Sequence, residues 1–449
     1  MLNDGSRVAV IGGGPAGSFF SYFCLDMARR IGADIELDVY EPRDFANAAP
    51  LGCNMCGGVV SESLVQALAT EGIEIPPSVV QRGIDSYVLH TDVGAVRIET
   101  PLKEKRIAAM HRGLGPRTVK ISKWSSFDGY LQQLAASKGA TIVRDSINDI
   151  GWHEGRPVVT TKGGVAGAYD LLAVAVGVNT AILKRFQQFG LNYTPPRTVK
   201  TAIFEYYLGE DIVAKIVGNS MHVFLLNIPR LEFAAIIPKG EYVTVCMLGE
   251  NIDNELIESF LACREVQACL PPDVIAGKSS CRCSPRINIE GAPEPFADRV
   301  VFIGDCGVTR LYKDGIGAAY RTGKAAATTA VFQGVSAESF RKYFKPVCQS
   351  IRRDNSYGKF TFAFTREIQK WQFSRRALLS IIEDEQRTPG GPQRMSRAMW
   401  DIFTGSAPYK EVLTRTLEPV FLLKLMWSFG RSGLPFGRRA HRKVPVDEQ

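Results

Sequence analysis

The sequence predicts an α/β protein of two or three domains. Three features predict it: an apolar strand near the N-terminus that leads into a glycine-rich turn and a helix, a similar strand–glycine–helix segment near residues 300–330, and a helical, basic final quarter. Antiparallel strands are expected between the two glycine-rich segments, where apolar residues alternate with little charge. The length of 449 residues exceeds what one ordinary core accommodates.

The composition is that of a globular protein, with 45% apolar and 22% charged residues. The first residues lead directly into a strand, so no secretory signal is expected, and the ten cysteines are read as reduced thiols in a cytoplasmic protein. No apolar run approaches the ~20 residues that span a bilayer. The net charge is +8, but residues 341–449 hold 21 Lys and Arg against 10 Asp and Glu, which leaves −3 for the first 340 residues. This asymmetry indicates an anionic partner, either a membrane surface or nucleic acid.

The first fifty residues fit a dinucleotide-binding unit. A strand at 8–11 is followed by G-x-G-x-x-G and a helix to about residue 31, and a second strand at 35–40 ends on an acidic residue. The first glycine permits a tight turn, the second lets the backbone approach a pyrophosphate, and the third lets helix and strand pack closely. The acid lies 24 residues beyond the last glycine, where it can accept hydrogen bonds from a ribose. The predicted contact residues are Gly12, Gly14, Pro15, Ala16, Gly17, Glu41 and Arg43.

A second segment, "ADRVVFIGDCGVTRLYKDGIGAAYRTGKAAATTAVF", completes the predicted cofactor site. The strand at 300–303 ends in Gly304-Asp305, and the helix that follows a loop opens with Gly315, Ile316 and Gly317. An acid at a strand end can hold sugar hydroxyls, and a glycine-rich helix start can hold an anion.

With these two segments the sequence resembles the FAD-dependent oxidoreductases of the hydroxylase and geranylgeranyl-reductase superfamily. The resemblance also covers "SKWSSFDGYLQQLAASKGATIV" and "YDLLAVAVGVNT", and extends over about residues 1–345. It implies FAD as the cofactor, with Asp305 at the ribityl chain and Gly315, Ile316 and Gly317 at the isoalloxazine ring. The sequence lacks the His, the Pro and the middle Asp of the aromatic hydroxylases, and the Trp-x-Trp-x-Ile-Pro box of the halogenases, which argues against oxygen chemistry.

Two further stretches resemble the geranylgeranyl-reductase branch. "NMCGGVVSESL" is similar to the branch's Cys-Gly-Gly loop beside the flavin, which implies a flavin contact for Cys56, Gly57 and Gly58 and makes Cys56 a candidate catalytic residue. "LEFAAIIPKGEYVTVCMLG" is similar to its substrate hairpin, but Ala235 and Ile237 replace the usual Trp and Phe. The predicted pocket remains apolar and is lined by Phe224, Phe233, Ala235 and Ile237.

The cysteine pattern leaves three readings open. Cys53 and Cys56 could belong to a metal site with Cys281 and Cys283, to a redox pair that involves Cys306, or to a loop packed on the flavin, and the last is preferred. No metal site is therefore predicted. The five histidines are scattered along the chain and none is an evident proton donor, and Tyr206, Tyr207 and Tyr312 are reserve candidates.

The C-terminal quarter combines an apolar stretch near residues 412–427 with five following cations, Arg431, Arg438, Arg439, Arg442 and Lys443. One interpretation is a set of helices packed on the cofactor domain with a solvated basic tail. The other is an amphipathic element on anionic lipid, with Trp427 at the headgroup level, which would make the cytoplasmic protein a peripheral membrane protein. A nucleic-acid partner is not expected, because no basic patch is interleaved with aromatic residues.

The sequence thus predicts an α/β fold: a Rossmann-type FAD-binding domain with an inserted antiparallel β-rich substrate domain (α+β) and a helical C-terminal region. The FAD domain is expected at 1–195, with a substrate-side insertion at 76–109, and at 280–345, the substrate domain at 196–279 and the helical region at 346–449. We expect reduction of carbon–carbon double bonds in an apolar isoprenoid or lipid substrate by hydride from reduced flavin. The electron donor would be NAD(P)H or a ferredoxin-like protein. A flavoprotein electron-transfer subunit and a flavin monooxygenase are the alternatives.

Overall fold

The structure is a computed structural model that describes residues 1–53, 55–100, 107–119, 124–188, 191–277, 279–388 and 390–416. The chain divides into two compact units, each described by itself. Unit 1 comprises Met1–Asn54, His111–Val199 and Arg286–Arg353, and unit 2 comprises Met55–Met110, Lys200–Pro285 and the chain from Asp354. The sequence analysis expected a separate helical region from residue 346, whereas the described residues after Asp354 cluster with unit 2.

Unit 1 is built on a six-stranded sheet in which β2, β1, β12 and β21 run parallel. The central strands are continuous apolar runs, as expected for parallel strands covered on both faces, and β1 and β12 are almost completely buried. In spatial order the strands are β20 (Phe296–Ala297), β21 (Val300–Phe302), β12 (Leu171–Val174), β1 (Arg7–Ile11), β2 (Glu36–Tyr40) and β8 (Thr141–Val143).

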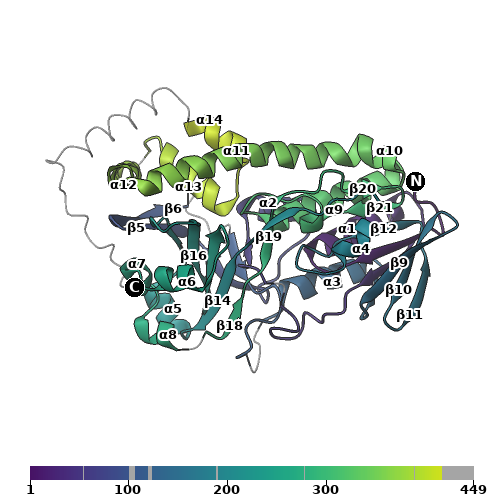
Figure 1. Ribbon diagram of the computed structural model, residues 1–449, viewed down its shortest axis with the longest axis horizontal. Coiled ribbons are helices and arrows are strands. Elements are labelled where there is room, and N and C mark those ends of the chain that lie inside the picture. The colour runs from purple at the N-terminus through teal and green to yellow at the C-terminus, as the bar shows by residue number, and fades with distance from the viewer. Residues whose placement is uncertain are drawn as a thin grey trace. The chain divides into compact units, whose positions relative to one another are not determined.

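Helices α1 (Pro15–Arg30) and α9 (Gly315–Phe332) pack on each other in unit 1, and α1 also contacts α3 (Phe127–Ser137). A Cβ at Gly323 of α9 would lie 3.0 Å from the carbonyl oxygen of Ala16, so this glycine permits close packing of the two helices. Figure 1 shows both helices beside the sheet. The remaining elements of unit 1 are β9 (Ile147–His153), β10 (Arg156–Thr161), β11 (Gly164–Ala168), α4 (Leu183–Gln188), β13 (Arg197–Lys200, reaching the boundary of the unit), β19 (Arg286–Glu290), η1 (Gly304–Cys306), α10 (Ala337–Ser339) and the π-helical turn η2 (Phe340–Phe344).

Unit 2 contains a mainly antiparallel seven-stranded sheet, with one parallel pair between β15 and β5. Its strands in spatial order are β18 (Cys281–Cys283), β14 (Ala202–Tyr207), β17 (Tyr242–Gly249), β16 (Leu231–Lys239), β15 (Ser220–Phe224), β5 (Ser86–Thr91) and β6 (Gly94–Glu99). A second sheet contacts β16 and consists of β3 (Val59–Val60), β7 (Ile107–Met110) and β4 (Val80–Ile84).

Period-2 alternation divides the side chains of the seven-stranded sheet between two faces. One face forms a buried core that includes Phe224, Ala234 and Ile236 of the sheet and Phe260 of α6. We call it the core face. The helices at this end of unit 2 are α5 (Glu210–Ile216), α6 (Asn254–Leu261), α7 (Arg264–Gln267) and α8 (Pro272–Ala276), which lie together in Figure 1.

The opposite face of the same sheet is partly covered by C-terminal helices. Phe233 of β16 stacks on Phe362 and meets Phe403 edge to face, with ring centroids 6.0 and 6.1 Å apart. Tyr87 of β5 also packs on Trp400 and Phe403. The C-terminal helices are α11 (Lys345–Lys370), α12 (Gln372–Arg387), α13 (Arg394–Thr404) and α14 (Tyr409–Thr416). Unit 2 also contains helix α2 (Glu62–Thr70).

The described C-terminal helices therefore pack on the sheet of unit 2, whereas the first interpretation of this region expected them on the cofactor domain. Trp400 and Tyr409 are almost completely buried. The predicted amphipathic element falls largely on residues 417–449, with Trp427 and the five cations, and these lie outside the described residues. Within the described part of the chain, no helix combines the length and the apolar character needed to cross a membrane.

Candidate functional site

The N-terminal glycine turn of unit 1 is too tightly packed for side chains. Gly12 has a φ of 102°, and a Cβ there would lie 2.5 Å from the carbonyl oxygen of Ala175. A Cβ at Gly17 would lie 1.9 Å from the carbonyl oxygen of Gly12. Helix α1 begins at Pro15, and its described first turn contains neither a capping side chain nor an acidic residue. The first turn of α1 therefore suits an anion such as a pyrophosphate.

Glu41, the predicted ribose acid, is buried at the end of β2 and holds the glycine turn in place. Its Oε2 accepts a hydrogen bond from the backbone N–H of Gly13 at 3.0 Å. Its Oε1 accepts from the backbone N–H and from Nε of Arg43, at 3.1 and 3.0 Å. The two predicted residues are thus an ion pair. Nη2 of Arg43 also donates to Oε2, at 3.3 Å, so the four or so lone-pair sites of this carboxylate are in use, and a ribose hydroxyl would replace or share one of these hydrogen bonds.

Two further side chains support this turn, and the sequence analysis did not identify them. Gln132 of α3 donates from Nε2 to the carbonyl oxygen of Gly13 at 3.1 Å. Arg144 donates from Nη2 to Oε1 of Gln132 at 3.0 Å. Because neither residue is near the turn in sequence, only the tertiary structure brings them to it.

The Gly304-Asp305 segment follows β21 and lies against the start of α1. Gly304 has a φ of 64°, and a Cβ there would lie 2.7 Å from Cβ of Ala16, one of the predicted contact residues. Its backbone N–H donates to Oγ1 of Thr322 in α9 at 3.0 Å. The two glycine-rich segments predicted to share one cofactor are therefore adjacent in unit 1.

Asp305 is partly buried beside the start of α9, and a Cβ at Gly315 would lie 3.9 Å from its Oδ1. Burial raises the pKa of the Asp305 carboxyl, against the opposing effects of a hydrogen bond with Thr309 and of the charge of Arg112. Arg112 itself makes a two-point ion pair with the buried Asp128, at 2.9 Å (Nε to Oδ1) and 2.8 Å (Nη2 to Oδ2). The sequence analysis missed this cation.

The three predicted flavin contacts at Gly315–Gly317 form the first turn of α9. The residue before them, Asp314, has a left-handed φ of 56°. A Cβ at Gly317 would lie 2.2 Å from Oδ1 of Asp314, so this carboxylate folds over the turn. It pairs with Arg310 at 3.7 Å and Arg321 at 3.2 Å. The start of α9 thus already has a negative charge beside it, which two arginines balance.

In unit 2, the predicted loop Cys56–Gly58, called the glycine loop, packs on the seven-stranded sheet. A Cβ at Gly57 would lie 3.0 Å from Sγ of Cys246 and 3.5 Å from Cδ1 of Ile237. Gly58 has a φ of 67°, and its N–H donates to Sγ of Cys56 at 3.4 Å. Both glycines are therefore needed for close contact with strands β16 and β17.

A buried ion pair lies beneath the glycine loop. A Cβ at Gly58 would lie 2.9 Å from Nζ of Lys239, whose side chain is 1% exposed. Nζ lies 3.5 Å from Oε1 of Glu205, which also accepts a hydrogen bond from Oγ1 of Thr244 at 2.8 Å. Among the described residues Oε2 of Glu205 has no hydrogen-bond partner. Burial raises the pKa of the Glu205 carboxyl, and Lys239 and Thr244 oppose the rise.

The four predicted pocket residues do not form one lining. Ala235 and Ile237 lie on the face that meets the glycine loop, because they pair across the ladder with Cys246 and Thr244. Phe233 lies farther along the same face, but the C-terminal helices cover it. Phe224 pairs with Ala234 and belongs to the core face, against Phe260 at 5.5 Å. The sequence analysis grouped Phe224 with the others because alternation alone does not say which face of a neighbouring strand is shared.

In the part of the chain that the structure describes, the cysteines selected from the sequence form no group of metal ligands. Cys281 and Cys283 lie on β18, and Cys306 is buried in unit 1, where it donates to backbone carbonyl groups. Among the described residues, one group of three potential ligands meets within 4.8 Å: His90, His222 and Cys269. The histidines were expected to be scattered, yet two of them are in contact.

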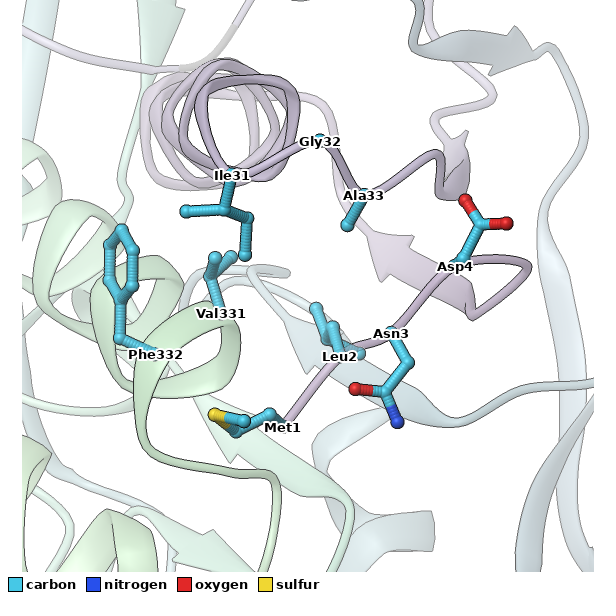
Figure 2. Close-up of a pocket in the computed structure, with 9 residues that line it drawn as sticks. All are labelled: Met1, Leu2, Asn3, Asp4, Ile31, Gly32, Ala33, Val331 and Phe332. Carbon is cyan, nitrogen blue, oxygen red and sulfur yellow. The ribbon is translucent and has the colours of Figure 1, made fainter.

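Figure 2 shows a surface pocket of about 290 Å³ in unit 1, lined by Met1–Asp4, Ile31–Ala33, Val331 and Phe332. Asp4 is its one acidic side chain, and none of the predicted site residues contributes to it. We assign it no function.

The fold and the paired glycine segments define the class: the chain has the fold of the FAD-dependent flavoprotein oxidoreductases, which confirms the predicted fold class. No family model matches the sequence, and no curated protein matches it. A geranylgeranyl bacteriochlorophyll reductase-like protein from Thermoplasma acidophilum is 15% identical, with a TM-score of 0.65, over 92% of this chain and 99% of that one.

Two other solved structures share the fold. The p-nitrophenol 4-monooxygenase PnpA from Pseudomonas putida is 12% identical, with a TM-score of 0.59, over 90% of this chain and 99% of that one. An HpxO variant from Klebsiella pneumoniae in complex with FAD is 16% identical, with a TM-score of 0.56, over 90% and 99% of the two chains. At these identities the likeness concerns the fold alone. The proteins that share the fold include both a reductase-like protein and a monooxygenase.

Proposed function

We propose that this protein is an FAD-dependent oxidoreductase that saturates carbon–carbon double bonds of an apolar, isoprenoid-type lipid. FAD would be held in unit 1 by the first turn of α1, by Glu41 and by Asp305. The tight glycine turn and the shared fold support this assignment. When bound in its reduced form, FAD would supply the hydride.

The observation that carries the proposal is the composition of the sheet face beneath the glycine loop. Ala235 and Ile237 make this face apolar, and Ala235 is small where the reductase branch has a large aromatic residue. An apolar surface binds a hydrocarbon chain by removing it from water, and the polar side chains on this face, Thr244, Glu205 and Lys239, bond to one another. The resemblance of the glycine loop to the loop beside the flavin in the reductase branch supports a flavin contact for Cys56.

Saturation of a double bond needs a proton as well as a hydride, and the sequence did not indicate a donor. We propose the Glu205–Lys239 pair for this role. Its two side chains are the charged groups that lie directly beneath the glycine loop, and the raised pKa of Glu205 favours a protonated carboxyl group. The hydride would go to one alkene carbon and the proton to its neighbour, which conserves charge. Solvent would then reprotonate the pair.

The electron donor would be NAD(P)H or a ferredoxin-like protein. The net positive charge of the chain would favour binding of an acidic carrier protein. A flavin monooxygenase remains a second candidate, because proteins of that activity share the fold. An electron-transfer subunit that serves a quinone or a protein partner is the third, since the substrate hairpin departs from the reductase pattern at Ala235 and Ile237.

We further propose that unit 2 contacts the membrane that contains such a lipid. Four aromatic side chains of α11 and the start of α12 are 38–57% exposed: Phe360, Phe364, Trp371 and Phe373. Exposed cations accompany them at Lys359, Lys370 and Arg376. Aromatic rings beside cations suit the interface of an anionic bilayer. The region after residue 416 would add to this contact.

An anaerobic experiment tests the function. The purified protein is loaded with FAD, reduced with dithionite and mixed with a geranylgeranyl lipid in detergent, and the lipid mass is then measured. Flavin reoxidation with mass gained in steps of two hydrogens supports the proposal. A flavin that stays reduced until a quinone or carrier protein is added favours electron transfer. NADPH-driven oxygen uptake that depends on an aromatic or lipid substrate favours the monooxygenase, and a protein that takes up no FAD overturns all three.

A further inference from the structure

Three side chains with metal-binding atoms meet in the interior of unit 2, on the core face of the seven-stranded sheet. Nε2 of His90 lies 2.9 Å from Nδ1 of His222. Sγ of Cys269 lies 3.1 Å from that Nδ1 and 3.8 Å from Nε2 of His90. The three side chains are 9%, 6% and 3% exposed. They come from positions up to 179 residues apart in the chain.

The sheet register and the helical layer bring these residues together. Strands β5 and β15 run parallel, with His90 beside Phe224 and His222 beside Val88. The two histidines are thus diagonal neighbours on one face, and their rings stack at 5.0 Å with 19° between the planes. Cys269 follows α7 in the helical segment packed over this face.

The spacing of the three atoms fits a tetrahedral metal site. With Zn–N bonds of about 2.0–2.1 Å and Zn–S bonds of about 2.3 Å, two ligand atoms of a tetrahedron lie roughly 3.3–3.6 Å apart. The observed separations of 2.9, 3.1 and 3.8 Å bracket that range. Shifts of a few tenths of an ångström would give one face of a tetrahedron. In the described chain no fourth ligating side chain joins the group, so water would take the remaining position.

Hydrogen bonding between the three groups accounts poorly for the arrangement. In a neutral imidazole each ring nitrogen has either one proton or one lone pair, so Nδ1 of His222 forms one good hydrogen bond, while His90 and Cys269 both lie within hydrogen-bonding distance of it. A metal ion would use the lone pairs of all three atoms.

The surroundings of the three side chains are largely apolar, and the charge of Arg97 is the one that acts on His222. Phe224 stacks on His90 at 4.7 Å and supplies an apolar wall. Arg97 is an unfavourable neighbour for a cation, and the thiolate formed on metal binding would offset it.

We propose that His90, His222 and Cys269 bind one Zn²⁺ ion in the core of unit 2. Binding would convert the Cys269 thiol to a thiolate and release one proton to solvent. No electrons are transferred. The ion would join two sheet strands to the overlying helical layer, so its role would be to stabilise unit 2, independently of the proposed flavin chemistry.

The test measures metal rather than activity. The full-length protein is stripped with a chelator and titrated with Zn²⁺ against a colorimetric competitor, and separately with Co²⁺, whose thiolate complexes absorb in the near ultraviolet. The wild-type protein should bind one equivalent that Cys269→Ser and His222→Asn lack, and should show a Co²⁺–thiolate band that Cys269→Ser lacks. Cys263→Ser, six residues away, is the matched control and should behave as the wild type.

Two measurements keep the test decisive if a variant folds poorly. A native mass spectrum of the wild-type protein after reconstitution should show one added zinc, and zinc should raise the melting temperature of the wild-type protein. Equal zinc uptake by the wild-type protein and a folded Cys269→Ser variant would overturn the proposal, because another site would then hold the ion. No added zinc and no thiolate band in the wild-type protein would also overturn it and leave a hydrogen-bonded cluster.

Discussion

Lys239 and Glu205 form an ion pair across the sheet of unit 2, with Nζ 3.5 Å from Oε1, and Gly58 lies directly over the ammonium group. The two side chains are 1% and 12% exposed. Such a pair is costly to desolvate and is weak evidence for stability alone. Its position beneath the glycine loop is therefore the reason to assign it a function.

Replacing Lys239 by Met should destabilise the protein in a pH-dependent manner. Loss of one partner of a buried pair costs roughly 3–5 kcal/mol when the other stays charged. Burial already raises the pKa of Glu205, and loss of the lysine removes an influence that lowers it. A carboxyl group whose pKa is raised in the folded state stabilises the fold at pH values below its pKa in the unfolded chain. This contribution is lost as the pH rises through the pKa of the folded state. The deficit of Lys239→Met should therefore grow with pH.

The free energy of unfolding in urea, determined at several pH values above 4.5, the ordinary pKa of a glutamate carboxyl group, measures this effect. The double variant Glu205→Gln with Lys239→Met is the control, because it has neither charge and its stability therefore lacks the decline with rising pH that the raised pKa of Glu205 causes. A deficit of Lys239→Met that is constant across the range would contradict the coupling.

Gly58→Ala should destabilise unit 2 more than other left-handed glycines do. The residue has a φ of 67°, and its Cβ would lie 2.0 Å from the carbonyl oxygen of Met110. Gly218 is the matched control, since its φ is 60° but the nearest atom lies 3.6 Å from its Cβ position. Gly218→Ala should cost about 1–2 kcal/mol for backbone strain alone, and Gly58→Ala clearly more. Equal costs in thermal unfolding would mean that the loop relaxes freely.

Glu41→Ala should weaken FAD binding at least tenfold, the equivalent of about 1.4 kcal/mol. The change removes the predicted ribose acceptor and also the carboxylate that holds Gly13 and Arg43. Glu36→Ala serves as the control, because Glu36 is an exposed acid at the other end of β2 and pairs with Arg7. Flavin retention on gel filtration and fluorescence titration give the readout. Unchanged affinity would remove Glu41 from the cofactor site.

Cys56→Ser should change the flavin absorption spectrum or the turnover rate if the glycine loop lies at the ring. The Sγ of Cys56 accepts from the N–H of Gly58, so serine preserves the local hydrogen bond and the fold. Cys281→Ser in β18 should leave both properties unchanged. A Cys56 variant identical to the wild type in spectrum and turnover would separate this loop from the flavin.

Binding to anionic vesicles should depend on the exposed aromatic side chains of α11 and α12. Trp371→Ser with Phe364→Ser should reduce binding in a sedimentation assay, most strongly at low salt. Truncation after residue 416 should reduce binding as well, and it leaves α14 in place, where Val412 is buried and Arg415 pairs with Asp401 at 2.7 Å. Binding that survives both changes would exclude these two elements as the membrane contact.

The predictable part of the site consisted of residues whose role depends on their own backbone. Gly12, Gly17 and Gly304 were found from the sequence because a close approach or a left-handed φ admits no other residue at low cost. The strands before them are short apolar runs, and the acid of Glu41 follows at a set distance. Their signals are local, so one sequence sufficed for the parallel core.

The parts that were missed depend on contacts between distant segments. Gln132 reaches Gly13 over 119 residues, and Lys239 pairs with Glu205 only because β14 and β16 flank β17 in the sheet. Phe224 was assigned to the wrong group because its face is set by strand order and register. His90 and His222 appeared scattered for the same reason.

The sequence by itself determined the class of fold, the position of the glycine turn and the acids at the strand ends, since these follow from steric limits and periodicity along the chain. Only the tertiary structure decided which side chains share a face and which buried charges meet. That information depends on strand order and on the layering of helices over sheets, because a pairing energy exists only once the two segments are in contact.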